Sequence, residues 1–140
     1  MRNIIRLKCA ICVLAFVFIG QSLSARVKYD KSMEPFIGVW TMQDKLGNDY
    51  EYKFQVVDGW VVLRYRFVDN YSQGSGMSAS RKKNIDYRYE DGCFHYNDDH
   101  PESEAYNSIS LYLKEGSLVE SNRHHHPGSN TTYINTYEKE

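Results

Sequence analysis

The feature that most constrains this chain is a turn signal that recurs between runs of alternating polar and apolar residues. An acidic residue followed by glycine stands at Asp58-Gly59, Asp91-Gly92 and Glu115-Gly116. A two-residue turn of type I′ needs positive φ at both central residues, and an acidic residue before glycine suits it. Such a turn reverses the chain between two antiparallel strands. The sequence therefore predicts three tight β-hairpins.

The residues around these turns alternate with a period of two. In Tyr50–Val57 the apolar side chains occupy every second position and the polar ones lie between them, and Trp60–Val68 repeats the pattern. Successive side chains of a strand point to opposite faces, so each strand has one face on a core and one in water. No helical periodicity appears from residue 36 onward. We therefore predict an all-β domain.

The expected strands follow one another with short connections. Two polar segments, 70–80 and 97–107, interrupt the alternation and are predicted to be loops. Sequential hairpins favour an up-and-down antiparallel meander, and a meander of eight twisted strands closes into a barrel because closure removes its exposed edges. The eight strands are Phe36–Gln43, Tyr50–Val57, Trp60–Val68, Ile85–Glu90, Cys93–Asn97, Ile109–Leu113, Leu118–Asn122 and Thr131–Glu138.

The N-terminal segment has the three parts of a secretory signal peptide. Three basic residues and no acid accompany the twelve-residue apolar run Cys9–Gly20, and small residues follow it, so we expect cleavage near Ser24 or Ala25. The apolar run is shorter than the ~18 residues of a membrane span. The chain thus divides into a signal peptide (1–24), a polar leader (25–35) and one β-domain (36–140), and the mature protein is expected to be secreted or periplasmic without a membrane span.

The mature chain is acidic. Removing residues 1–24 leaves 14 of the 17 Lys and Arg residues and all 18 Asp and Glu residues, a formal charge of −4. A nucleic-acid-binding protein normally presents a basic face, so nucleic acid is not an expected partner.

Cys93 is the only cysteine that remains after the signal peptide, so no internal disulfide is expected. A free thiol forms an intermolecular disulfide, acts as a nucleophile with a nearby base, or is a small buried hydrophobe. His95 shares a strand face with Cys93, and Asp98 follows, but no nucleophile motif surrounds them. The sequence therefore assigns no catalytic residue, and an enzyme is not the favoured interpretation.

The first strand carries a family resemblance. Phe36-Ile37-Gly38-Val39-Trp40 is similar to the Gly-x-Trp signature that opens lipocalins and their calycin relatives. In that family the tryptophan closes one end of the barrel and the glycine allows close backbone approach. We expect no C-terminal helix after the last strand, which differs from a typical lipocalin. The chain more nearly resembles the short, helix-less lipocalin-like domains of secreted bacterial proteins.

The resemblance and the aromatic stripes on consecutive strands predict a binding protein that holds a small apolar or aromatic ligand inside the barrel. An eight-stranded barrel is also sometimes filled by its own side chains, so the alternative is a structural or partner-binding envelope protein. The sequence specifies neither a cofactor nor an oligomeric state. The expected ligand-binding residues are Trp40, Tyr52, Phe54, Leu63, Tyr65, Tyr87 and Tyr89.

A further alternative is a metal or haem site on the run His124-His125-His126. On a strand, His124 and His126 point to the same side while His125 faces away. Two imidazoles bind a transition metal when a third ligand converges with them. The other interpretation is a solvated polar strand end beside the Pro127-Gly128 turn. The candidate third ligands are His95, His100, Asp98 and Asp99.

Arginines on the polar strand faces leave two possibilities open. Arg64, Arg66 and Arg88 alternate with apolar residues, so they either pair with neighbouring acids in solvent or, if the inner face is the polar one, bind a carboxylate or phosphate.

Overall fold

The structure, a computed structural model, describes residues 27–71, 79–100 and 104–140. The predicted signal peptide lies outside the described residues. No helix in the described part of the chain is long and apolar enough to cross a membrane. The elements are β1 (Val27–Lys28), the 3₁₀ helix η1 (Lys31–Phe36), β2 (Gly38–Gln43), β3 (Asp49–Val57), β4 (Trp60–Asp69), β5 (Ala79–Asn84), β6 (Arg88–Glu90), β7 (Cys93–His100), β8 (Ala105–Lys114), β9 (Ser117–His126) and β10 (Ser129–Lys139).

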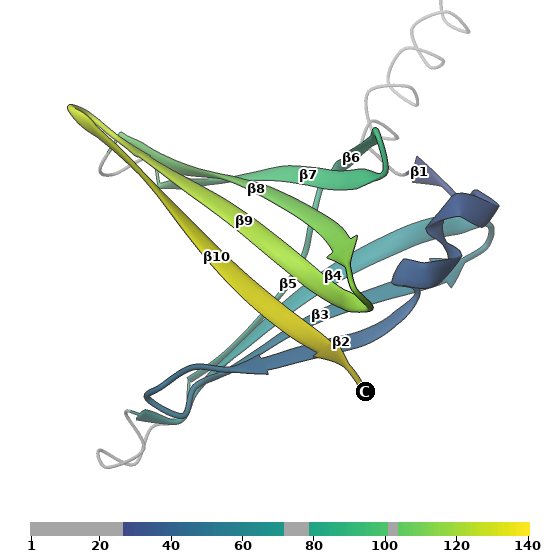
Figure 1. Cartoon of the computed structure of the whole chain (residues 1–140), viewed down its shortest axis with the longest axis horizontal. Coiled ribbons are helices and arrows are strands. Elements are labelled where there is room, and N and C mark those ends of the chain that lie inside the picture. The colour runs from purple at the N-terminus through teal and green to yellow at the C-terminus, as the bar shows by residue number, and fades with distance from the viewer. Residues whose placement is uncertain (1–26, 72–78, 101–103) are drawn as a thin grey trace, which may run out of the picture.

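The strands form a nearly closed antiparallel barrel, which confirms the predicted fold class. Their order is β1-β4-β3-β2-β10-β9-β8-β7-β6, with β5 pairing with the same edge of β4 as β1 does. From β2 to β5, and again from β6 to β10, neighbours in sequence are neighbours in the sheet, as expected of a meander. The two halves of the sheet face each other and meet where β10 reaches β2 (Figure 1).

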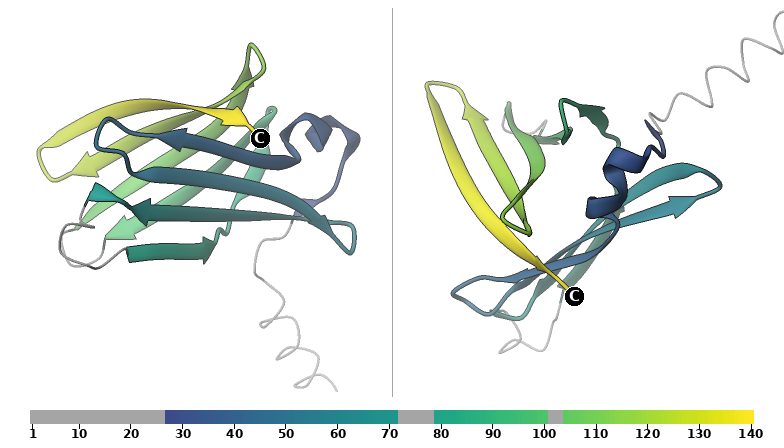
Figure 2. Two further views of the ribbon diagram at one scale, coloured as in Figure 1. Left: turned by 90° about the horizontal axis from the view of Figure 1, so that it is seen from below. Right: turned by 45° about the vertical axis from the view of Figure 1, so that its right-hand side comes forward.

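Strand pairing joins the two halves of the sheet on one side of the barrel, whereas on the other side the halves are linked by the connection between β5 and β6. Thr41 and Trp40 of β2 pair with Glu138 and Lys139 of β10. On the opposite side, the segment between β5 and β6 crosses from one half of the sheet to the other, and Ile85 donates its backbone N–H to Leu63 (2.9 Å). The right-hand view of Figure 2 shows the two halves diverging from the place where β10 meets β2.

All three predicted hairpin turns have the expected backbone. Asp58, Asp91 and Glu115 have φ of 51°, 52° and 51°, and the glycines that follow have φ of 81°, 75° and 81°. Positive φ at both central residues defines the type I′ turn, whose twist matches that of the flanking strands. These turns set the register, so that Val57 pairs with Trp60 across the first of them.

The polar leader contributes more structure than the sequence predicted. Asp30 caps η1 by accepting a hydrogen bond from the Ser32 backbone N–H (2.8 Å). Met33 and Phe36 of this short helix are buried, and Trp40 donates its Nε1–H to the Phe36 carbonyl (2.8 Å). Met33 of the leader and Phe36, which was predicted to begin the first strand, are the buried apolar residues through which η1 covers one end of the barrel.

Both halves of the sheet extend into segments that the sequence predicts to be loops. The acidic stretch 97–107 is largely strand: β7 runs to His100 and β8 begins at Ala105. The serine-rich stretch 70–80 ends in β5, which pairs with β4 from Arg64 to Asp69. Backbone pairing with a neighbouring strand overrides the low strand propensity of polar residues there.

Gly38 of the Gly-x-Trp signature has a backbone conformation that side chains disfavour. Its φ is +137°, and an added Cβ would stand 2.7 Å from Cε of Lys139. We expect Gly38→Ala to lower the free energy of unfolding by more than about 1 kcal/mol, because alanine at positive φ is strained. Urea denaturation measures this. An unchanged or raised midpoint would contradict a requirement for glycine here.

Candidate ligand pocket

The barrel interior has an apolar, packed end and a polar, hollow end. The packed end lies beneath η1, where the rings of Phe36, Phe54 and Phe94 contact one another with centroids 4.8 to 5.6 Å apart. The hollow end lies toward the opposite ends of the same strands and contains a pocket of about 310 Å³. This volume is at the lower limit of small-molecule sites.

The pocket is built from both halves of the sheet. Its lining combines five tyrosine rings with three carboxylates and two side-chain amides. It includes no Lys, Arg or His among the described residues. The lining residues are Met42, Asp44, Tyr50, Tyr52, Tyr65, Tyr96, Asp98, Ile109, Glu120, Asn122, Tyr133 and Asn135.

Glu120 of β9 forms the base of the pocket and is only 6 % exposed. Tyr52 donates its hydroxyl to Oε2, and Asn135 donates its amide to Oε1 (2.8 Å). Tyr137 makes a longer contact with Oε2 (3.5 Å). The Tyr52 and Tyr96 hydroxyl oxygens are 2.5 Å apart. The Tyr52 hydroxyl has a single proton, which it donates to Glu120. The Tyr96 hydroxyl therefore donates its own proton to the Tyr52 oxygen.

Burial changes the acidity of the tyrosines around Glu120. Loss of solvent, followed by repulsion from neighbouring groups that include Glu120, raises the pKa of Tyr52, Tyr96 and Tyr137 well above the ordinary value. The pKa of Tyr65 is raised for the same reasons. These four phenols are therefore neutral hydrogen-bond donors at physiological pH.

The mouth of the pocket is organised by Asp44, in the turn after β2. Its carboxylate accepts hydrogen bonds from the backbone N–H groups of Leu46 and Asn48 (both 2.9 Å) and from the Tyr50 hydroxyl (3.1 Å). Burial alone would raise the pKa of Asp44, but these hydrogen bonds outweigh it and hold the pKa below its usual value. Asp44 is therefore an anion that positions a tyrosine ring at the pocket edge.

The predicted ligand-binding residues are divided between the two ends of the barrel. Tyr52 and Tyr65 line the pocket, with ring centroids 5.2 Å apart. Tyr89 packs on Phe94, with ring centroids 4.7 Å apart. The other four are almost wholly buried in the packed core: Trp40, Phe54, Leu63 and Tyr87. A direct role in ligand contact stays a prediction for all seven.

Glu120, Asn122 and Asn135 belong to the pocket but were not among the residues predicted from the sequence. Alternation along β9 places Glu120 on the same face as Leu118, which is fully buried. An acidic residue at a strand position whose side chain faces the apolar core indicates a buried polar site. Asn122 continues that face, and its Oδ1 atom is buried without a hydrogen-bond partner among the described residues.

The histidine run occupies the end of β9, and His124 and His126 lie on one side of the strand with ring centroids 6.3 Å apart. Each ring already has a partner: His124 Nδ1 lies 2.7 Å from the Asn107 amide oxygen, and His126 Nδ1 lies 3.0 Å from the Pro127 carbonyl. His125 faces the other way and stacks on Tyr106 at 4.3 Å.

The candidate third metal ligands do not complete a site with these histidines. His95 is bonded to Ser110 on the outer face of β7, and Asp98 lines the pocket. The side chains of Asp99 and His100 lie outside the described part of the chain. Within the described residues, no three His, Cys, Asp or Glu side chains are placed to hold a metal ion. Metal or haem binding stays a prediction.

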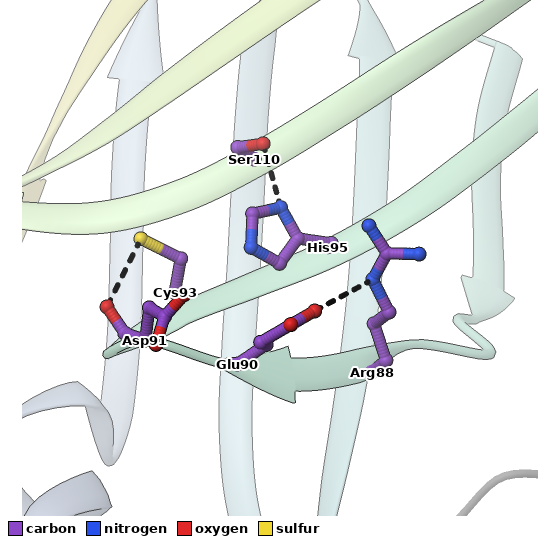
Figure 3. A network of polar contacts seen from close by, with 6 residues as sticks. All are labelled: Arg88, Glu90, Asp91, Cys93, His95 and Ser110. Atoms are coloured by element: carbon purple, nitrogen blue, oxygen red, sulfur yellow. Dashed lines mark hydrogen bonds and ion pairs between the residues drawn. The ribbon is translucent and has the colours of Figure 1, made fainter.

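Cys93 and His95 share the outer face of β7 but engage different groups (Figure 3). The Cys93 thiol contacts the Asp91 carbonyl (Sγ to O, 3.8 Å), and His95 Nδ1 lies 2.8 Å from Ser110 Oγ. Burial, aided by the charge of Asp91, raises the pKa of the Cys93 thiol. A raised pKa lowers the thiolate fraction, so this environment does not activate a nucleophile.

The arginines lie on the outer surface, on the side opposite the apolar face. Arg66 pairs with Glu51 (3.9 Å) and Arg88 with Glu90 (3.7 Å), while Arg64 donates to Asn84 (3.2 Å). None of these three arginines lines the pocket, and the acidic side chains among its described lining residues are Asp44, Asp98 and Glu120.

Together, the fold and the cavity define a nearly closed antiparallel β-barrel with a tyrosine- and carboxylate-lined pocket at one end. No protein-family model, curated protein or solved structure matches the chain.

Proposed function

We propose that this protein is a secreted or periplasmic binding protein that holds a small ligand in the pocket at the polar end of its barrel. The observation that carries the proposal is the cavity of about 310 Å³ lined by five tyrosines. Ligand sites combine apolar and aromatic walls with a few polar groups that fix orientation. Tyrosine supplies both, because its ring is apolar and its hydroxyl is a hydrogen-bonding group.

Two further observations support this function. The Gly-x-Trp signature at Gly38-Val39-Trp40 is similar to that of lipocalins, and an all-β, nearly closed barrel is compatible with a lipocalin-like fold. The N-terminal signal sequence supports export. We therefore place the protein among short lipocalin-like binding proteins as a proposal, with an aromatic or apolar ligand body resting against rings such as those of Tyr52 and Tyr65.

A screen of small aromatic acids, alcohols, amines, fatty acids, retinoids and haem tests the proposal. A ligand that binds only the folded protein stabilises it by about 2.7 kcal/mol when the free ligand concentration is one hundred times its Kd. We expect at least one compound class to raise the Tm, and isothermal titration calorimetry to give one site per chain.

Two matched pairs of variants assign the binding to the pocket. Asn122→Phe fills the cavity and should abolish binding, whereas Ser121→Phe adds the same bulk to the outer face of β9 and should not. If Asn122→Phe fails to fold by circular dichroism, Tyr133→Ala, which removes an exposed ring of the pocket wall, is compared with Ile134→Ala on the outer face.

The alternative function, a structural or partner-binding envelope protein, has one specific observation in its favour. Val56, Val57 and Trp60 are each about 40 % exposed at the tip of the β3–β4 hairpin. An exposed apolar group of this kind suits contact with another surface. Absence of any pocket-dependent ligand in the screen would favour this function over ligand binding.

A further inference from the structure

We propose that the ligand of this pocket is a small organic cation, such as a protonated primary amine carried on an aromatic or aliphatic body. This inference rests on the proposed binding function and specifies the charge of the ligand. Three features carry it: the sign of the lining charges, the partners of Glu120, and the buried acceptor on Asn122.

The lining charges all have the same sign. Asp44, Asp98 and Glu120 line the pocket, and no Lys, Arg or His belongs to its described lining. A concave site lined by charges of one sign focuses the electric field and raises the local concentration of the opposite ion. The charges of the described lining residues therefore favour cations over anionic ligands such as fatty acids.

The partners of Glu120 among the described residues are all neutral. Tyr52, Tyr137 and Asn135 supply its hydrogen bonds, and none of them carries a positive charge. Burying an ion without a countercharge costs several kcal/mol, which hydrogen bonds offset only in part. A ligand ammonium group near Glu120 would provide the missing countercharge. The hydrogen bonds to both carboxylate oxygens hold the group in one orientation before the ligand arrives.

The tyrosine rings provide a second source of attraction for a cation. Tyr52 and Tyr65 lie with their centroids 5.2 Å apart and tilted by 51°, and three more tyrosines surround the same space. The face of an aromatic ring is electronegative and attracts ammonium groups, most strongly where water is excluded. Rings combined with carboxylates are the usual chemistry for recognising organic ammonium ions.

Asn122 supplies an independent indication of a hydrogen-bond donor. Its side chain lines the pocket, and its Oδ1 atom is buried without a partner among the described residues. A buried acceptor without a hydrogen bond destabilises the folded protein. A rotation of the amide toward the cavity would let an ammonium N–H satisfy it. A ligand with several N–H donors fits this acceptor and the carboxylates together.

A bare metal ion fits the pocket less well than an organic cation. Ca²⁺ needs six to eight oxygen ligands at 2.3–2.6 Å, whereas the described residues include no group of three acidic, histidine or cysteine side chains placed to hold an ion. The volume of about 310 Å³ also leaves room for an organic body.

Matched probes that differ only in charge test the proposal. Phenethylamine, 2-phenylethanol and phenylacetate share an aromatic ring and differ in their terminal group. We expect calorimetry to show the amine binding at least tenfold more tightly than the alcohol, and the carboxylate binding more weakly than either. Added Ca²⁺ should not compete with the amine.

Three variants connect the preference to the pocket. Asp98→Asn and Glu120→Gln each remove one negative charge while preserving shape, and each should weaken amine binding about fivefold without weakening alcohol binding. Glu90→Gln removes the same charge outside the pocket, where Glu90 pairs with Arg88, and should leave the ratio unchanged. Circular dichroism confirms folding, and Asp98→Asn alone suffices if Glu120→Gln does not fold.

The outcomes separate the two proposals. Equal or tighter binding of the alcohol or the carboxylate would overturn the cation inference while leaving the binding function intact. The cation inference would also be overturned if the wider screen found a neutral or anionic ligand that binds in the pocket, and found no amine that binds. The binding function would again stand. If no compound binds in a pocket-dependent way, the proposed function and this inference fall together.

Discussion

Raising the pH from 10 to 12 is expected to unfold this protein. An unfolded tyrosine loses its proton near pH 10, whereas burial raises the pKa of Tyr52, Tyr96 and Tyr137 well beyond this value. It raises the pKa of Tyr50 and Tyr87 to about 12. Above pH 10 the unfolded state therefore binds fewer protons than the folded state, and stability falls as the pH rises.

The size of the effect follows from proton counting. Each tyrosine that stays protonated only in the folded state lowers the free energy of unfolding by about 1.4 kcal/mol per pH unit. For Tyr52, Tyr96 and Tyr137 together the slope is roughly 4 kcal/mol per pH unit. A typical domain has only about 5–15 kcal/mol of stability. The contribution is fully present below pH 10 and is lost progressively above it.

Urea denaturation followed by circular dichroism at pH 8, 10 and 11 measures the slope. Tyr52→Phe should reduce it by about 1.4 kcal/mol per pH unit, because one fewer proton is linked to folding. Tyr133→Phe is the control, since Tyr133 is 56 % exposed. The conclusion that burial raises the pKa of these tyrosines would be wrong if every tyrosine ionised near pH 10 while the circular dichroism spectrum stayed unchanged.

Phe94→Ala is expected to cost about 3–5 kcal/mol of stability, the range for removing a buried aromatic ring. Phe94 is wholly buried. Its ring centroid lies 4.8 Å from Phe36 of η1, 5.0 Å from Phe54 of β3, and 5.1 and 4.7 Å from Tyr87 and Tyr89. The ring therefore joins both halves of the sheet to the helix that covers the barrel end.

Urea denaturation at pH 7 measures this loss against Ile134→Ala. Ile134 is 59 % exposed, so its truncation should change stability by no more than about 0.5 kcal/mol. Similar small losses for both variants would show that the aromatic end of the barrel is not the principal core. A large loss for Phe94→Ala alone would agree with the packing described above.

Much of the fold could be predicted because its signals are local. The three type I′ turns depend on two adjacent residues each, and alternation within a strand identifies the inner face without knowledge of its neighbours. Tyr52, Phe54 and Leu63 were therefore assigned correctly to the inner face, where they are at most 1 % exposed. Arg64 and Arg66 lie on the opposite face, as the same alternation requires.

The candidate site was harder to predict because its residues come from separate strands. Asp44, Tyr52, Tyr96 and Glu120 belong to a turn and three strands spread over 77 positions of the sequence, and only strand order and register bring them together. The hydrogen bonds of Glu120 come from β3 and β10, so its role depends on how the two halves of the sheet face each other.

The sequence by itself determined the hairpins, the meander and the inner and outer faces, because positive-φ turns and period-two alternation act over a few residues. Only the tertiary structure decided that β10 pairs with β2, that η1 fills one end of the barrel and that carboxylates gather at the other. Closure and cavity depend on strand length, twist and packing between distant segments, which no short stretch of sequence specifies.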